Sequence, residues 1–178
     1  MGSAWAIVLA AAVGALSALI TNWFDRALQR RDLERQGVEQ RRQFLRENLI
    51  EFVEFGRARG TAVHKLATEA LRGFDPFHAA VSGAIGTEHR EASDRFRVAL
   101  AKIRLTVSDG DVEEAITRVK KADSILSGAT GLLSDRMLNQ TDPLPAIGAI
   151  LSAIGDLNDT FDELIESARA RLADPIET

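Results

Sequence analysis

The clearest structural signal in the chain is the stretch of residues 147–168, which reads IGAILSAIGDLNDTFDELIESA. Its apolar residues are Ile147, Ile150, Ile154, Leu157, Phe161, Leu164 and Ala168. They recur at alternating spacings of three and four residues, which is the period of one face of an α-helix. Because this spacing also forms the a/d seam between packed helices, we expect a helix whose apolar side faces a helical core.

Three earlier blocks of the chain show the same helical period. Their apolar faces are Leu45, Leu49, Phe52, Gly56, Val63, Leu66 and Leu71 in the first block, Ala92, Phe96, Ala99, Ile103 and Val107 in the second, and Val112, Ile116, Val119, Ala122, Leu126, Ala129 and Leu133 in the third. No run of alternating β-branched residues competes with them. The pattern therefore predicts helices only.

Turn signals separate the four blocks. Pro76 disfavours a helical conformation at the residue before it, so residues 73–76 should end the first block. Asp111, followed by Glu114 three residues later, fits a capping box at the start of the third block. Asp142 and Pro143 can cap and open the fourth. Four helices with short turns predict an antiparallel four-helix bundle over residues 44–178.

The N-terminal segment has a different composition, because residues 1–24 contain no charged side chain. The apolar run from Ala4 to Trp23 has the roughly 20 residues that a membrane-spanning helix needs. Trp5 and Trp23 bracket the run, about 27 Å apart along a helix, and indole rings favour the two membrane interfaces. We therefore expect a single transmembrane helix over residues 1–24 that continues into the bundle.

Two other interpretations of this segment are a cleaved signal peptide and a buried core helix. A signal peptide carries basic residues before a shorter apolar run and a small-residue cleavage site after it, and this segment shows neither. A helix buried on all sides needs more surrounding protein than a chain of 178 residues offers. The uncleaved anchor is the favoured interpretation.

Arginine dominates the next segment, residues 25–43, which we expect to form a basic juxtamembrane helix. The arginines after the span are Arg26, Arg30, Arg31, Arg35, Arg41, Arg42 and Arg46. Basic flanks stay on the cytoplasmic side, so we expect the N-terminus outside the plasma (inner) membrane and the bundle in the cytoplasm. These arginines can bind anionic lipid headgroups. An ordinary solvated helix with local ion pairs would also account for them.

The distribution of charged residues along the chain also indicates which class of partner to expect. Residues 73–178 contain eleven basic and eighteen acidic side chains. This acidic remainder would repel phosphates, and the basic segment lacks interleaved aromatic residues, so we expect no nucleic-acid partner.

Small residues recur every four positions in the predicted span, at Ala6, Ala10, Gly14 and Ala18. Such a helix-packing ridge lets two spanning helices approach closely, which suggests a homo-oligomer. An alanine-rich helix also produces such a ridge by chance.

Side chains that could carry chemistry are few. The sequence contains no cysteine, and its three histidines form none of the spacings that place metal ligands on one helix face. Asp156, Asp159, Glu163 and Glu166 line one helix face and could dock a basic partner, although a solvated face is the commoner role. We expect no catalytic residue, no metal site and no cofactor.

These features favour a membrane-anchored scaffold or interaction protein whose bundle docks protein partners. A membrane-acting effector or phage-exclusion (defence) component, whose span oligomerises, is the first alternative. A bundle that senses a small ligand is the second. Architecture alone does not decide among them.

Overall fold

The structure is a computed structural model, which describes the backbone of residues 2–107 and 110–173 and the side chains of residues 36–107 and 110–170. Five helices account for the described chain, which contains no β-strand. They are α1 (Gly2–Leu71), α2 (Phe74–Ser82), α3 (Ala84–Thr106), α4 (Gly110–Leu138) and α5 (Leu144–Ala173). The all-helical prediction is confirmed.

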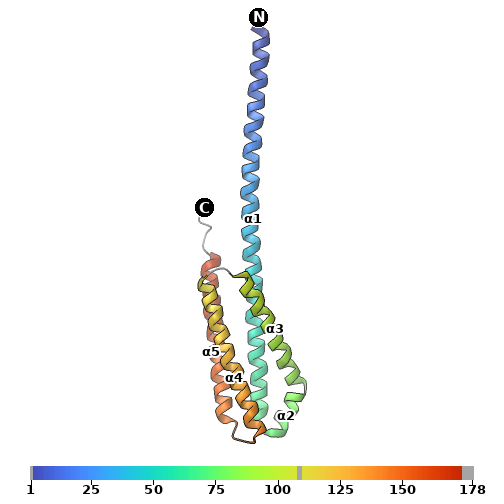
Figure 1. Ribbon diagram of the computed structural model, residues 1–178, viewed down its shortest axis with the longest axis vertical. Coiled ribbons are helices and arrows are strands. Elements are labelled where there is room, and N and C mark those ends of the chain that lie inside the picture. Colours follow the sequence, from blue (N-terminus) through green and yellow to red (C-terminus); the bar gives the residue numbers. More distant parts are fainter. Residues whose placement is uncertain (1, 108–109, 174–178) are drawn as a thin grey trace. The chain divides into compact units, whose positions relative to one another are not determined.

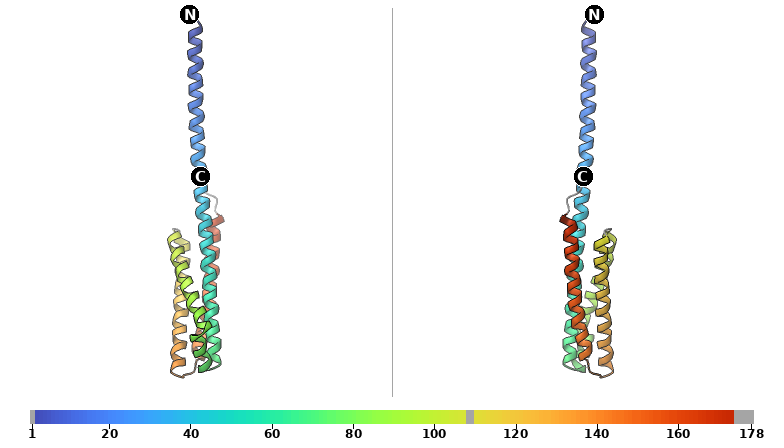
Figure 2. Two further views of the ribbon diagram at one scale, coloured as in Figure 1. Left: turned by 90° about the vertical axis from the view of Figure 1, so that its right-hand side faces the viewer. Right: turned by 90° about the vertical axis from the view of Figure 1, so that its left-hand side faces the viewer.

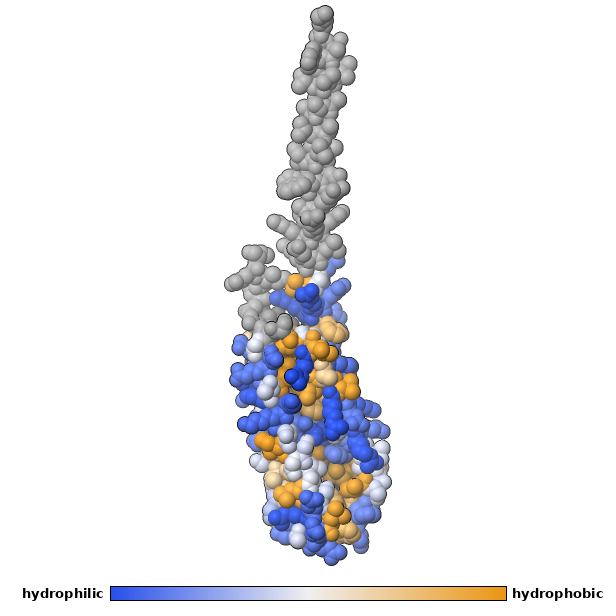
Figure 3. Space-filling model, in the orientation of Figure 1, coloured by the Kyte–Doolittle hydropathy of each residue, from blue (hydrophilic) through white to orange (hydrophobic). Residues whose placement is uncertain are grey.

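The chain divides into two compact units, Met1–Phe44 and Leu45–Thr178. The second unit is a helical bundle built from the C-terminal part of α1 and from α2 to α5 (Figure 1). Within it, α1 and α5 form one layer, and α3 and α4 form the other (Figure 2). On the bundle face shown in Figure 3, apolar residues form a patch in the upper part and smaller groups below it, with hydrophilic residues around them.

The predicted apolar faces form the core of this bundle. All seven residues predicted for the third block are buried in α4, and six of the seven predicted for the fourth are buried in α5, with Ile154 half-buried. Leu71 is an exception, because 58% of it is exposed. Ala70 takes the core position, and Leu71 lies about 100° further around the helix, so it points outward.

Two helix boundaries differ from the prediction. Gly73, with φ 119°, ends α1 in a backbone conformation that favours glycine, whereas Pro76 lies in the first turn of α2, where proline is tolerated. Helix α4 begins at Gly110, so Asp111 lies inside its first turn and is not the N-cap of a capping box. At α5, Asp142 Oδ1 accepts a hydrogen bond from the Leu144 amide (3.0 Å), as the capping prediction requires.

Glycine also shapes the junction of α2 and α3, which Gly83 separates. Gly86 is buried close behind this break, and a Cβ atom there would lie 1.8 Å from the Val81 carbonyl oxygen. Only glycine therefore permits this approach of the two helices.

Three phenylalanines from three helices meet at the centre of the core. The ring of Phe52 (α1) stacks on that of Phe96 (α3) with centroids 5.0 Å apart. Phe161 (α5) meets both rings edge-on, at 5.6 and 6.3 Å. These are favourable geometries for aromatic pairs. Gly56 leaves the space that Phe161 fills, because a Cβ atom at residue 56 would lie 2.0 Å from Phe161 Cζ.

Substitution of Gly56 by alanine should therefore destabilise the bundle by about 1–3 kcal/mol, because the buried Phe161 ring is already packed against Phe52 and Phe96. The matched control is Gly155→Ala, at a helix position where an added Cβ would contact nothing. It should stabilise the protein by roughly 0.5–1 kcal/mol. Urea unfolding monitored by circular dichroism measures both changes. Equal effects of the two substitutions would contradict the tight contact at Gly56.

Candidate functional site

A charged side chain, Arg59 of α1, lies inside the bundle with 7% of its surface exposed. Its guanidinium forms an ion pair with Asp123 of α4. Its Nε donates a hydrogen bond to Ser93 Oγ of α3 (3.2 Å), and its Nη2 donates one to Ser127 Oγ of α4 (2.7 Å). We call these four residues the Arg59 network. It joins three helices through a single side chain.

The surroundings of Arg59 are partly apolar. Its guanidinium carbon lies 5.8 Å from the centroid of the Phe96 ring, within range of a cation–π interaction. Burial lowers the pKa of Arg59, and repulsion by Arg97 lowers it further. Arginine keeps its proton in proteins, so its charge persists in this partly dry environment. The Asp123 carboxylate balances that charge.

His89 of α3 lies one helical turn before Ser93 and is half-buried. Burial lowers the pKa of His89, and repulsion by Arg59 and Arg90 adds to the effect. The imidazole is therefore neutral at pH 7. The other two histidines, His64 and His78, are exposed.

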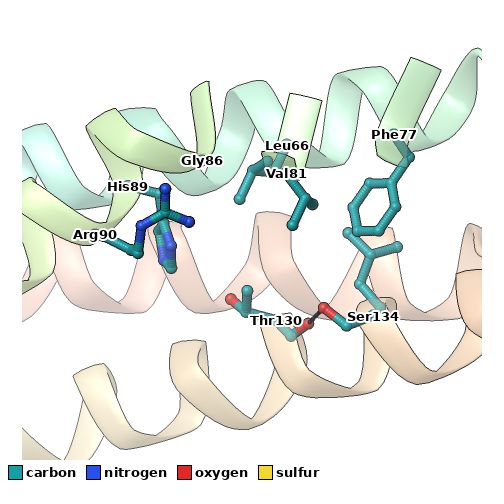
Figure 4. A pocket seen from close by; sticks show the side chains of 9 residues that line it. Leu66, Phe77, Val81, Gly86, His89, Arg90, Thr130 and Ser134 are labelled. Carbon is teal, nitrogen blue, oxygen red and sulfur yellow. Dashed lines mark hydrogen bonds between the residues drawn. The ribbon is translucent and has the colours of Figure 1, made fainter. Parts of the chain in front are cut away.

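Next to His89, a cavity of about 100 Å³ opens between α1, α2, α3 and α4. Its lining residues are Leu66, Phe77, Val81, Gly86, His89, Arg90, Thr130, Leu133 and Ser134. Figure 4 shows His89 and Arg90 together at one end of the cavity, and Phe77 at the other. The cavity is therefore polar at one end and apolar at the other.

The two hydroxyl groups in the cavity wall already donate hydrogen bonds to the backbone of α4. Thr130 Oγ1 donates to the Leu126 carbonyl oxygen (2.7 Å), and Ser134 Oγ donates to the Thr130 carbonyl oxygen (3.2 Å). Each hydroxyl proton is thereby used. Hydrogen-bond donors for a bound molecule consequently come from His89 and Arg90.

The four predicted acidic residues lie exposed along α5. Glu163 pairs with Arg118 of α4 (3.1 Å), and Glu166 pairs with Arg169 of α5 (3.0 Å). Asp156 and Asp159 form no ion pair within the described part of the chain. The acidic strip is therefore partly neutralised by the protein itself, and its two remaining carboxylates face solvent.

Other predicted residues lie where the structure does not describe side chains. They are Trp5, Trp23, Arg26, Arg30, Arg31 and Arg35 at the membrane interface, and Ala6, Ala10, Gly14 and Ala18 in the helix-packing ridge. Over the described residues, no helix has the length and apolar character required to cross a membrane. The side chains of the predicted span at 1–24 are not among those that the structure describes, so the span stays a prediction.

The Arg59 network and the cavity were not predicted from the sequence. The position of Arg59 in the apolar pattern could have indicated that it is buried. Phe52, Gly56, Val63 and Leu66 follow a seam of alternating spacing, and Arg59 occupies the seam position between Gly56 and Val63. A charged residue at such a position indicates a buried, paired charge. The partners of Arg59 flank the seams of distant helices and leave no comparable pattern.

Comparison with known proteins identifies no relative of this chain: no family model, no curated protein and no solved structure matches it.

Loss of one partner in the Arg59 network should be more costly than loss of both. Asp123→Leu leaves the Arg59 charge buried, and we expect a loss of about 2–4 kcal/mol in the free energy of unfolding. The double substitution with Arg59→Met should lose less than Asp123→Leu alone. As a control, Glu88→Leu breaks the exposed Lys65–Glu88 pair and should cost less than about 1 kcal/mol. A double variant less stable than Asp123→Leu would contradict the paired-charge account.

The neutral His89 should make stability depend on pH. Its native pKa lies below the ordinary value of 6.5, so on acidification the unfolded chain binds a proton before the native protein does. This contribution lowers stability as the pH falls below 6.5 and is absent at higher pH. His89→Gln should remove it, whereas His78→Gln, at an exposed position, should not. Urea unfolding at pH 7.5 and pH 5 tests this, and identical pH dependence in wild type and His89→Gln would contradict it.

Proposed function

We propose that this protein is a membrane-tethered interaction module, with a single-span anchor at residues 1–24, a basic juxtamembrane helix at 25–43 and an antiparallel four-helix bundle that docks partners. The observation that carries the proposal is the charge-free run of residues 1–24, followed at once by an arginine-rich segment. An apolar run of this length is costly to expose to water and favourable in a bilayer.

Charge distribution supports the proposed orientation and lipid contacts. Seven arginines lie between residues 26 and 46, against the three acidic residues Asp32, Glu34 and Glu39. Basic residues near a span stay on the cytoplasmic side and attract anionic headgroups, at about 1 kcal/mol per residue near the surface. The bundle would then be cytoplasmic, with the N-terminus outside.

The bundle supplies the proposed docking surface. Asp156 and Asp159 point into solvent on α5 and form no ion pair with other described residues, so a basic surface on a partner protein would complement them. The small-residue ridge through Gly14 would bring two or more copies together in the membrane, which would multiply the docking faces in one assembly. In this proposal the protein acts by binding and not by catalysis.

A specific observation favours a second function, the sensing of a small ligand. The cavity beside His89 and Arg90 combines an apolar end with the donors of a neutral imidazole and a charged guanidinium, and ligand sites commonly have this composition. The two functions are compatible, because the cavity and the acidic strip occupy different parts of the bundle.

Because the natural chain contains no cysteine, single introduced cysteines can test the anchor and its orientation. We expect Ser3→Cys to react with a membrane-impermeant maleimide in intact spheroplasts. Ser124→Cys, at an exposed position on α4, should react only after lysis. Deletion of residues 2–24 should move the protein from the membrane pellet to the supernatant. Labelling of Ser124→Cys in intact spheroplasts would indicate the opposite orientation. Extraction of the full-length protein from membranes by carbonate would contradict the anchor.

A further inference from the structure

The cavity between α1, α2, α3 and α4 separates apolar and polar groups along its length. Leu66, Phe77 and Leu133 are buried apolar residues of its wall, and Val81 adds a fourth apolar side chain. His89 and Arg90 occupy the opposite end (Figure 4). A ligand that fits this arrangement has a short aliphatic part and a polar head.

The polar end carries positive charge that the described protein does not balance. Arg90 donates one hydrogen bond to Thr87 Oγ1 (3.1 Å) and forms no ion pair with a described residue. Its guanidinium has further N–H donors available. Close to it, the paired Arg59 also contributes to the electrostatic potential, since both arginines lower the pKa of His89.

Carboxylates near this end are already bound to other cations. Glu88 accepts two hydrogen bonds from Lys65 Nζ, at 2.6 and 2.8 Å. Glu91 pairs with Arg95 (3.7 Å). Asp123 belongs to the Arg59 network, and on α3 Asp94 pairs with Arg97 (3.6 Å). Arg90 is therefore the arginine at the cavity that an added anion could pair with.

Size restricts the ligand further. A cavity of about 150 Å³ holds a molecule of about six heavy atoms such as benzene, and this cavity measures about 100 Å³. By that scale the cavity holds about four heavy atoms, so it suits the carbon chain of an acid of up to four carbons whose carboxylate oxygens reach the exposed Arg90. The hydroxyl groups of Thr130 and Ser134 present acceptors and no free proton, so they favour placing an anionic head at the Arg90 end.

We propose that this cavity binds a short-chain carboxylate, with its head on Arg90 and His89 and its tail against Leu66, Phe77 and Leu133. The charge-assisted bond between guanidinium and carboxylate supplies specificity, and the apolar wall limits chain length. This inference rests on the second proposed function and names its ligand class, and it depends neither on the membrane anchor nor on a protein partner. The site gives the bundle a means of responding to a small metabolite.

Isothermal titration of the purified full-length chain with butyrate at pH 7 tests the proposal. We expect a dissociation constant of the order of 1 mM, and binding at least tenfold weaker for the isosteric but uncharged butyramide. Arg90→Gln should weaken butyrate binding at least tenfold. Arg95→Gln is the matched control, because it removes an exposed arginine from the same helix outside the cavity, and it should bind as wild type does. Equal binding of butyrate and butyramide would overturn the proposal.

A second variant separates the cavity from anion binding at an exposed arginine. Ser134→Leu fills the cavity with methyl groups and leaves Arg90 unchanged, so butyrate binding should be lost while circular dichroism confirms the fold. Butyrate should also raise the pKa of His89, because a nearby anion favours the imidazolium form. The histidine resonances in proton NMR report this change, with His89→Gln giving the assignment. Wild-type affinity in Ser134→Leu, or an unmoved His89 pKa at saturating butyrate, would overturn the proposal.

Discussion

The ion pair between Arg59 and Asp123 constrains how the helices of the bundle can pack. An apolar seam alone tolerates small slips between helices, because one aliphatic contact substitutes for another. A buried guanidinium does not tolerate such a slip, because the slip would leave its charge without a partner in a partly dry environment. Arg59 reaches Ser93 on α3 and Asp123 on α4 at the same time. One side chain therefore sets the register of α1 against two other helices.

Aromatic packing complements this polar constraint along the same seam of α1. Phe96 links the two, because its ring stacks on Phe52 and also lies under the Arg59 guanidinium. Gly56, three residues before Arg59, admits the Phe161 ring of α5. One turn later, Gly60 would place a Cβ in ordinary contact with Ile154. Helix α1 thus approaches α5 closely at its glycines, and the long Arg59 side chain contacts α3 and α4.

The helical faces were predictable because burial imposes a period on the sequence. In α4 and α5 the period holds over residues 112–133 and 147–168, and all of these predicted residues except the half-buried Ile154 are buried in the core. Boundaries were less predictable, because proline at residue 76 is compatible both with ending one helix and with opening the next. In the structure the positive φ of Gly73 ends α1, so Pro76 belongs to the start of α2. The presence of a glycine at residue 73 did not by itself predict this backbone conformation.

The polar interior was less accessible to sequence analysis than the apolar core, for a physical reason. A core residue is recognised from neighbours three and four positions away, whereas Arg59 meets partners 34 and 68 residues away in the chain. The cavity depends on residues from four helices. The break at Gly83 makes α2 a separate helix, which places Phe77 and Val81 opposite Leu133 and leaves His89 at the other end of the opening. The apolar period of a helix predicts which of its residues are buried. It does not predict where side chains from four helices leave a space between them.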